Sequence, residues 1–217
     1  MVWHKRFLKS RQGIVGIEAA IVLIAFVVIA SALAYVVINM GFYSAQKAKE
    51  TIDRGVGEAT SSLQLDGTVV GKTNDNSKIQ YLVIPVKLAV GQSEVDLSSK
   101  TVTVSVFYTN FTLANIYKGT LEENNGTDVA DVAYLLNATL LQNNDGDGAI
   151  FAIYNDDGDS VLEVNEKAFL VVKLSSSHLL ESYSKVKIEV RTSRGAALTV
   201  ERLIPVGLPK DAYVDLG

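Results

Sequence analysis

The 217-residue sequence contains no cysteine, only three prolines and only two histidines. Without cysteine, the chain can form no disulfide bond, no thiolate metal site and no cysteine nucleophile. The first proline is Pro85, so no proline ring interrupts a helix before that position. Neither histidine, His4 or His178, is accompanied by a nucleophile-elbow or zinc-helix motif. These absences argue against an enzyme.

The N-terminal leader is positively charged, whereas the rest of the chain has an excess of negative charge. The leader, residues 1–13, contains four of the twenty basic residues and none of the twenty-four acidic residues, and the next basic residue is Lys47. Without the leader, sixteen basic residues face twenty-four acidic ones, which gives a formal charge of −8. An acidic chain without basic clusters argues against nucleic-acid binding, because cations are needed to neutralise phosphate.

A long apolar run follows the leader. Ile14–Met40 spans 27 residues, and Glu18 is its only charged residue. A membrane-spanning helix needs about 20 apolar residues, whereas the apolar core of a cleaved secretory signal is shorter. The basic leader would stay in the cytoplasm by the positive-inside rule, so we expect the rest of the chain to lie outside.

The helical pattern continues beyond the apolar run. Apolar residues recur every three or four positions at Phe42, Ala45, Ala48, Ile52, Val56, Ala59 and Leu63. This spacing predicts one helix from Ile14 to about Leu63. Fifty residues with a rise of 1.5 Å each make a helix of about 75 Å. One small domain cannot cover such a length, so most of the helix needs other chains.

After Asp66-Gly67 the apolar pattern changes to a period of two residues. It predicts strands at Lys78–Leu88, Thr101–Thr109, Val132–Leu141, Ala149–Tyr154, Ala168–Leu174, Lys185–Thr192 and Ala197–Leu203. Short strands separated by turn residues are typical of an immunoglobulin-like antiparallel sandwich or barrel. The sequence therefore predicts an α+β protein with a leader at 1–13, a helix at 14–65 and a β domain at 66–217.

The order of leader and apolar run resembles the class III signal peptides of type IV pilins and archaeal flagellins (archaellins). The stretch Gly16–Gly67 is similar to the N-terminal region of an archaellin, and Asp156–Leu174 and Gly195–Pro209 are similar to later segments of that family. This resemblance implies that a prepilin- or preflagellin-type signal peptidase cuts after Gly13. Ile14 would then be the first mature residue, and the apolar helix would stay in the protein.

Glu18 is a carboxylate in an apolar helix, where an unpaired charge is costly. Cutting after Gly13 would make it the fifth mature residue, and in type IV pilins an acid at this position pairs with the new N-terminus of a neighbouring subunit. The alternative is a residue at the membrane edge without a role in assembly. Small residues on the same helix, including Gly16, Ala19 and Ala20, would let helices approach closely, although a single-span anchor tolerates them too.

The resemblance implies a structural subunit that polymerises through its N-terminal helix into the archaeal flagellum (archaellum) filament for swimming. It also implies several partners: other copies of the chain, the signal peptidase, a membrane assembly platform and an ATPase motor. The precursor would lie in the cytoplasmic membrane and the filament outside the cell. Many archaellins lack an acid at the Glu18 position, so a subunit of an adhesive type IV-like pilus is the alternative. A monomeric membrane-anchored receptor or hydrolase is a third possibility.

Two loops are rich in potential oxygen ligands. Asn155, Asp157, Asp159 and Glu166 match positions one, three, five and twelve of a calcium-binding loop, although the first position is Asn and the usual glycine is a serine. The loop 143–148 matches only the first half of such a motif. Solvated turns contain the same residue types. We expect no required cofactor, and a structural calcium ion at the second loop is a hypothesis.

Three N-glycosylation sequons, at Asn110, Asn125 and Asn137, lie in the expected β domain. Single sequons are frequent by chance, but three in an extracellular domain predict a glycoprotein. Glycans would fit only on faces that a polymer leaves open.

Overall fold

The computed structural model describes residues 12–59, 62–91, 94–121, 131–136, 141 and 146–217. The chain divides between Arg54 and Gly55 into two compact units. The described part of the first unit is helical, and the second unit contains the last residues of the helix and the β domain.

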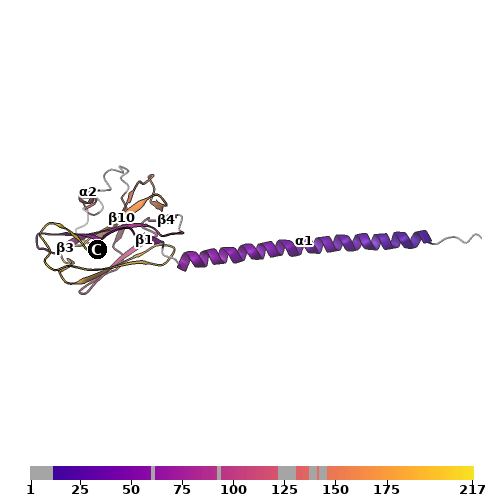
Figure 1. Cartoon of the computed structure of the whole chain (residues 1–217), viewed down its shortest axis with the longest axis horizontal. Coiled ribbons are helices and arrows are strands. Elements are labelled where there is room, and N and C mark those ends of the chain that lie inside the picture. The colour runs from indigo at the N-terminus through magenta and orange to yellow at the C-terminus, as the bar shows by residue number, and fades with distance from the viewer. Residues whose placement is uncertain (1–11, 60–61, 92–93, 122–130, 137–140, 142–145) are drawn as a thin grey trace, which may run out of the picture. The chain divides into compact units, whose positions relative to one another are not determined.

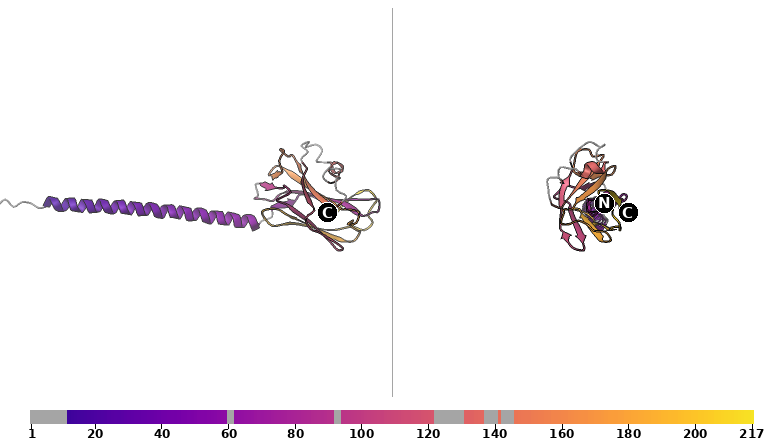
Figure 2. Two further views of the ribbon diagram at one scale, coloured as in Figure 1. Left: turned by 180° about the vertical axis from the view of Figure 1, so that it is seen from behind. Right: turned by 90° about the vertical axis from the view of Figure 1, so that its left-hand side faces the viewer.

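The helix α1 runs from Gln12 to Ala59 over 48 residues, and Figures 1 and 2 show it as one unbroken helix. We expected the helical segment to extend through residue 65. This predicted C-terminal end was wrong, because α1 ends at Ala59. Leu63–Leu65 form strand β1, where Leu63 lies opposite Leu88 and is buried in the core of the β domain. Gly55 and Gly57 weaken the end of the helix, and core burial then outweighs the helical spacing of Leu63.

The β domain contains thirteen strands and one short helix in the described residues. They are β1 (Leu63–Leu65), β2 (Val70–Thr73), β3 (Ile79–Leu88), β4 (Glu94–Asp96), β5 (Thr103–Tyr108), β6 (Thr112–Leu113), β7 (Tyr117–Thr120), α2 (Val132–Leu136), β8 (Gly148–Tyr154), β9 (Val161–Glu163), β10 (Lys167–Lys173), β11 (Lys185–Arg191), β12 (Leu198–Leu203) and β13 (Tyr213–Asp215). Six of the seven expected strands correspond to β3, β5, β8, β10, β11 and β12.

The expected strand Val132–Leu141 was wrong, because residues 132–136 form helix α2. The carboxylate of Asp131 accepts a hydrogen bond from the Ala133 N–H at 2.9 Å, and the Asp131 carbonyl accepts one from Leu135 at 3.1 Å. This is the arrangement of a helix N-cap. A five-residue apolar run does not distinguish a strand from a helix by its pattern alone.

The strands form three sheets. A seven-stranded sheet has the order β13-β2-β3-β10-β8-β7, with β1 also paired to β3, and a four-stranded sheet has the order β12-β11-β5-β6. The strands β4 and β9 form a small third sheet. All pairs are antiparallel except β7 with β8. The α+β fold with a β-sandwich is therefore confirmed, with one parallel pair that we did not expect.

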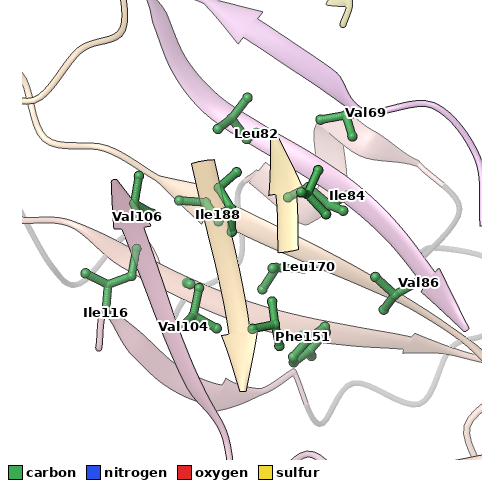
Figure 3. Close-up of a cluster of buried hydrophobic side chains, with 14 of the residues drawn as sticks. Val69, Leu82, Ile84, Val86, Val104, Val106, Ile116, Phe151, Leu170 and Ile188 are labelled. Atoms are coloured by element: carbon green, nitrogen blue, oxygen red, sulfur yellow. The ribbon is translucent and has the colours of Figure 1, made fainter. Parts of the chain in front are cut away.

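The core lies between the two large sheets. Figure 3 shows Leu82, Ile84, Leu170 and Phe151 of the seven-stranded sheet beside Val104, Val106 and Ile188 of the four-stranded sheet, and they belong to one buried cluster. A second cluster lies on the outer face of the seven-stranded sheet. There, Val83, Val171 and Ile150 pack with Leu135 and Leu136 of α2. The β domain thus buries apolar side chains on both faces of its larger sheet.

The β domain has two ends that differ in their loops. At one end, which we call the Ser62 end, the Ser62 carbonyl accepts a hydrogen bond from Ala89, and the Ser62 hydroxyl lies 2.5 Å from that of Thr192. At the opposite end, which we call the Tyr183 end, Ile79 pairs with Leu180, and the Tyr183 N–H donates to Ile204. The ten residues of β3 separate the two ends by about 30 Å.

Candidate functional site

The surface of α1 is the largest exposed apolar surface among the described residues. Phe26 is 72% exposed, Met40 is 70% exposed, and Val56 near the end of the helix is 58% exposed. The four consecutive residues 21–24, Ile-Val-Leu-Ile, are all exposed, and at about 100° per residue they cover every side of the helix. A helix that is apolar all round requires an apolar environment. The helix is also long and apolar enough to cross a membrane.

The expected assembly residues lie at the start of this helix. Glu18, Ala19 and Ala20 are exposed within α1. A Cβ atom built on Gly16 would meet no atom within 4 Å, so no contact within this chain requires a glycine there. Its small size is therefore available for a second helix. Gly13 and Ile14 also lie in α1, but their side chains are outside the described residues.

The last third of α1 combines apolar and charged side chains. Phe42, Ile52 and Val56 of the expected stripe are exposed. Lys47 forms an ion pair of 2.8 Å with Glu50 one turn further on. Both side chains are more than half exposed, and such pairs contribute little to stability. Among the described residues, this part of the helix therefore also presents exposed apolar side chains.

The expected calcium loop has a definite geometry at the Ser62 end of the β domain. Asn155, Asp157 and Glu166 line one hollow of about 350 Å³ together with Glu163. Carboxylate oxygens of Asp157 and Asp159 lie within 4.8 Å of each other, close enough to share one cation. The structure thus brings Asn155 and Glu166 to the hollow and Asp159 to its neighbour Asp157.

Two acidic residues of this loop were missed from the sequence. Asp156 belongs to the group of three carboxylates with Asp157 and Asp159, and Glu163 lines the hollow. The calcium-loop template skips Asp156 at position two, but it includes position nine, which is Glu163, so the spacing could have identified Glu163. Asp156 and Asp159 also accept hydrogen bonds from backbone N–H groups two residues further on, as in ordinary Asx turns.

Glu166 is the most constrained of these acids. It is 7% exposed, and its Oε2 accepts a hydrogen bond from the Glu163 N–H at 2.9 Å. Burial raises the pKa of Glu166, and the neighbouring charges of Asp156, Asp157 and Glu163 raise it further. A cation in the hollow would relieve this repulsion, because it favours the ionised form. The residues present therefore fit a hard divalent cation such as calcium.

His178 lies in a cluster that superficially resembles a hydrolase triad. Its Nδ1 atom is 2.6 Å from the Asp147 carboxylate and 3.1 Å from the Ser175 hydroxyl, and its ring contacts the Phe111 ring in a tilted arrangement. A Ser-His-Asp relay needs the serine and the acid on opposite ring nitrogens. Here both lie at the same nitrogen, so this arrangement cannot act as a relay and instead ties two loops together.

The sequon at Asn110 lies in the turn between β5 and β6, and Asn110 is exposed. The other two sequons, at Asn125 and Asn137, lie outside the described residues. Phe111, the middle residue of the first sequon, is held between the rings of Tyr108 and His178. The first sequon is therefore both accessible and well anchored.

Comparisons with known proteins agree on one family. The sequence model for archaeal-type flagellin matches residues 13–202. Probable flagellin 1 of Aeropyrum pernix is 43% identical over 210 residues, which cover 97% of this chain and all of that protein. Probable flagellin 2 of Archaeoglobus fulgidus is 30% identical over 227 aligned positions, which cover 98% of this chain and 99% of that protein.

Two solved structures are also similar. The crystal structure of archaeal flagellin FlaB1 from Methanocaldococcus jannaschii matches with a TM-score of 0.59 at 18% identity, covering 72% of this chain and 97% of that one, and so shares the fold. A chain of the archaeal flagellum of Methanospirillum hungatei matches with a TM-score of 0.50 at 25% identity, covering 88% of this chain and 94% of that one.

Proposed function

Because this chain belongs to the archaeal-type flagellin family, we infer that it is a structural subunit of an archaeal flagellum filament. It polymerises through α1, whose apolar side chains are exposed on every side of the helix. This unsupported helix is the observation that carries the function, because only lipid or other copies of the helix can cover it. The family favours a filament for swimming over an adhesive pilus.

A deletion strain tests this function. Cells without the gene should lose their flagellar filaments in electron microscopy and stop swimming in a motility assay, and the restored gene should recover both. Deleted cells that still swim but no longer attach to surfaces would identify an adhesive pilus instead.

The leader is removed after Gly13 by a peptidase of the prepilin or preflagellin type. This step is supported by the basic leader that ends in Gly13 directly before the apolar run. Mass spectrometry of purified filaments should give Ile14 as the first residue, and a mature chain that begins at Met1 or Ile17 would contradict this cut. Gly13→Val should leave the precursor uncut and the cells without filaments.

The precursor lies in the cytoplasmic membrane with its β domain outside the cell. Cutting frees the Ile14 amine, and α1 then moves from lipid into the filament. Little hydrophobic free energy is gained in this exchange, because lipid is already apolar. Close helix packing at Gly16, Ala19 and Ala20 and a pair between Glu18 and the Ile14 amine of a neighbour favour the polymer. A membrane platform with an ATPase motor adds subunits and turns the filament.

The loop Asn155–Glu166 binds a structural calcium ion in the extracellular β domain. The hollow lined by Asn155, Asp157, Glu163 and Glu166 and the grouped carboxylates of Asp156, Asp157 and Asp159 support this proposal. Equal melting temperatures of the full-length protein with calcium and with a chelator would contradict it. The double change Asp157→Asn with Asp159→Asn should abolish any shift.

Asn110 carries an N-linked glycan on the outside of the filament. Its exposure and its place in a turn support this proposal, as does its Asn-Phe-Thr sequon. Mass spectrometry of peptides that contain Asn110, Asn125 and Asn137 would measure the occupancy of all three sequons. An unmodified Asn110 peptide as the only form would refute the proposal at this position.

A further inference from the structure

The hydroxyl and amide side chains in the apolar part of α1 lie in one line. Between residues 19 and 43 they are Ser31, Tyr35, Asn39 and Tyr43, each four positions after the one before. Residues four apart lie on the same side of a helix, about 40° apart around its axis. We call Tyr35, Asn39 and Tyr43 the polar line. The remaining sides of the helix carry no hydroxyl, amide or charged side chain over this stretch.

The polar line has no hydrogen-bond partner among the described residues. The Ser31 hydroxyl donates to the Val27 carbonyl at 2.7 Å, so Ser31 is satisfied within the helix. By contrast, the side chains of Tyr35, Asn39 and Tyr43 form no hydrogen bond with any described residue, and the two tyrosines are 70% and 63% exposed. A hydroxyl or an amide is costly to bury without a partner. The polar line therefore needs partners from outside its chain wherever the helix is covered.

Exposed apolar side chains surround the polar line. At about 100° per residue, the side chains between Tyr35 and Tyr43 occupy the other sides of the helix. Those that are apolar and more than half exposed are Val36, Val37, Ile38, Met40 and Phe42. An apolar environment that covers them on every side also covers the polar line. Burial of this segment therefore leaves three polar side chains to be satisfied.

The membrane and the filament differ in the partners that they offer to the polar line. About 20 residues cross the hydrocarbon of a bilayer, so a span that begins at Ile14 ends near Tyr35. In the precursor, the polar line would thus lie at the level of the lipid headgroups, where water and headgroups bind tyrosine and asparagine side chains. The helix loses these partners when it moves into the filament.

We propose that the polar line of one subunit forms hydrogen bonds with the polar line of a second copy of this chain. The proposal rests on the filament function inferred above and names one face of α1 by which the copies meet. Hydrogen bonds between helices would fix the register of neighbouring subunits, as a polar residue does in a coiled coil. Apolar contacts alone specify this register less well.

The chemistry of the polar line selects a second copy as the partner. A tyrosine hydroxyl and an asparagine amide each contain both a donor and an acceptor, and neither is charged at neutral pH. The line is therefore complementary to itself, and no like charges meet. Parallel helices related by rotation about a common axis turn the same face toward that axis, which brings their lines together. The backbone groups of α1 are already bonded within the helix and do not compete.

Substitutions within the polar line test whether the lines are partners of each other. Tyr35→Phe with Tyr43→Phe removes two hydroxyls and keeps both rings, so the Asn39 amide would be left buried and unpaired. Purified filaments, which contain no membrane, should dissociate in denaturant more readily, with each contact weakened about fivefold or more. Adding Asn39→Leu should restore most of this loss, because no unpaired group remains. Ser31→Ala is the matched control and should change nothing, because Ser31 bonds within its own helix.

Light scattering of the filaments measures their dissociation. Filaments of the double tyrosine variant that are as stable as the wild type would overturn the proposal, and weaker membrane insertion in that case would identify the line as a membrane anchor. A further loss on adding Asn39→Leu would also overturn it, because the amide would then have a partner other than the tyrosines.

Cross-linking tests which face of α1 the copies share, and the absence of cysteine gives it no background. Val37 is 68% exposed and lies about 200° around the helix from Asn39, on nearly the opposite side. Full-length chains with Asn39→Cys or Val37→Cys are assembled into filaments and treated with a short bis-maleimide. Covalent dimers are expected for Asn39→Cys and not for Val37→Cys. Intact Asn39→Cys filaments without dimers, or dimers of Val37→Cys in their place, would overturn the proposal, whereas a wild-type chain that forms no filaments would overturn the proposed function instead.

Discussion

The helix α1 and the β domain differ in where their apolar side chains lie: those of α1 are exposed, and those of the β domain are largely buried. The backbone of α1 is hydrogen-bonded within the helix, but its described large apolar side chains, from Ile17 to Val56, are exposed. The β domain buries its apolar side chains between two sheets and under α2. The helix therefore depends on lipid or on other copies, whereas the domain supplies its own core. Changes in the helix should affect assembly, and changes in the domain should affect folding.

The largest expected effect concerns assembly and the Glu18 pair. Glu18→Ala would leave the Ile14 amine of a neighbour buried without a partner, which costs about 3–5 kcal/mol per contact. Filament numbers in electron microscopy should fall sharply. Membrane insertion should improve, because one charge leaves the apolar helix. Normal filament numbers would show that the acid is dispensable, and a lower melting temperature of the β domain would break the separation between the two regions.

The next effect concerns folding. Leu170 on β10 is fully buried between the sheets, and Leu170→Ala should lower the free energy of unfolding by about 2–5 kcal/mol. Thermal unfolding of the unassembled protein measures this. Leu203→Ala is the control, because Leu203 is exposed and its truncation should change the free energy by less than about 0.5 kcal/mol. Equal losses in both variants would contradict a self-sufficient core.

A smaller effect, that of Glu166→Gln on the melting temperature, should have opposite signs without and with calcium. The raised pKa of Glu166 means that its ionised form is disfavoured in the folded state. Stability from this group therefore falls as pH rises from its usual pKa of 4.5 through the raised value. Glu166→Gln should raise the melting temperature at neutral pH in a chelator, because it removes this penalty. With calcium, it should lower the melting temperature, because a ligand is lost. The same direction in both buffers would exclude an ion at this loop.

The smallest effect concerns Asp66, whose carboxylate lies 2.7 Å from the ammonium groups of both Lys87 and Lys167. Hydrogen bonds from Lys167 and Lys87 lower the pKa of Asp66 below its usual 3.8. The stabilisation is therefore present above pH 3.8 and is lost as pH falls through the lowered pKa. Asp66→Asn should cost roughly 0.5–1 kcal/mol at pH 7 and nothing in strong acid. An equal cost at both pH values would show that packing, not charge, holds Asp66.

The sequence predicted those parts of the fold in which the pattern of apolar residues is compatible with only one type of secondary structure. The length and apolar character of residues 14–40 predicted a helix, and the alternation along β5 and β11 matches one buried face. The predicted helix at Leu63 and the predicted strand at residues 132–136 were wrong, because packing in the core decides the secondary structure of short apolar stretches. The parallel pairing of β7 depends on contacts far apart in the chain, which no local pattern records.

The candidate sites, too, could be predicted only where residue types and spacing match a known pattern. The oxygen-rich loop was visible because residue types and spacing follow a known ligand pattern. Asp156 was missed because position two is not a ligand position in that pattern, whereas Glu163 at position nine could have been found from the spacing.

Helical reconstruction of native filaments by electron cryomicroscopy tests most directly whether other copies cover α1. The exposed apolar residues between Ile17 and Val56 should pack against α1 helices of neighbouring subunits in the filament core, with the β domains outside. A filament in which neighbouring α1 helices do not touch, or in which the β domains alone make the subunit contacts, would contradict this division between helix and domain.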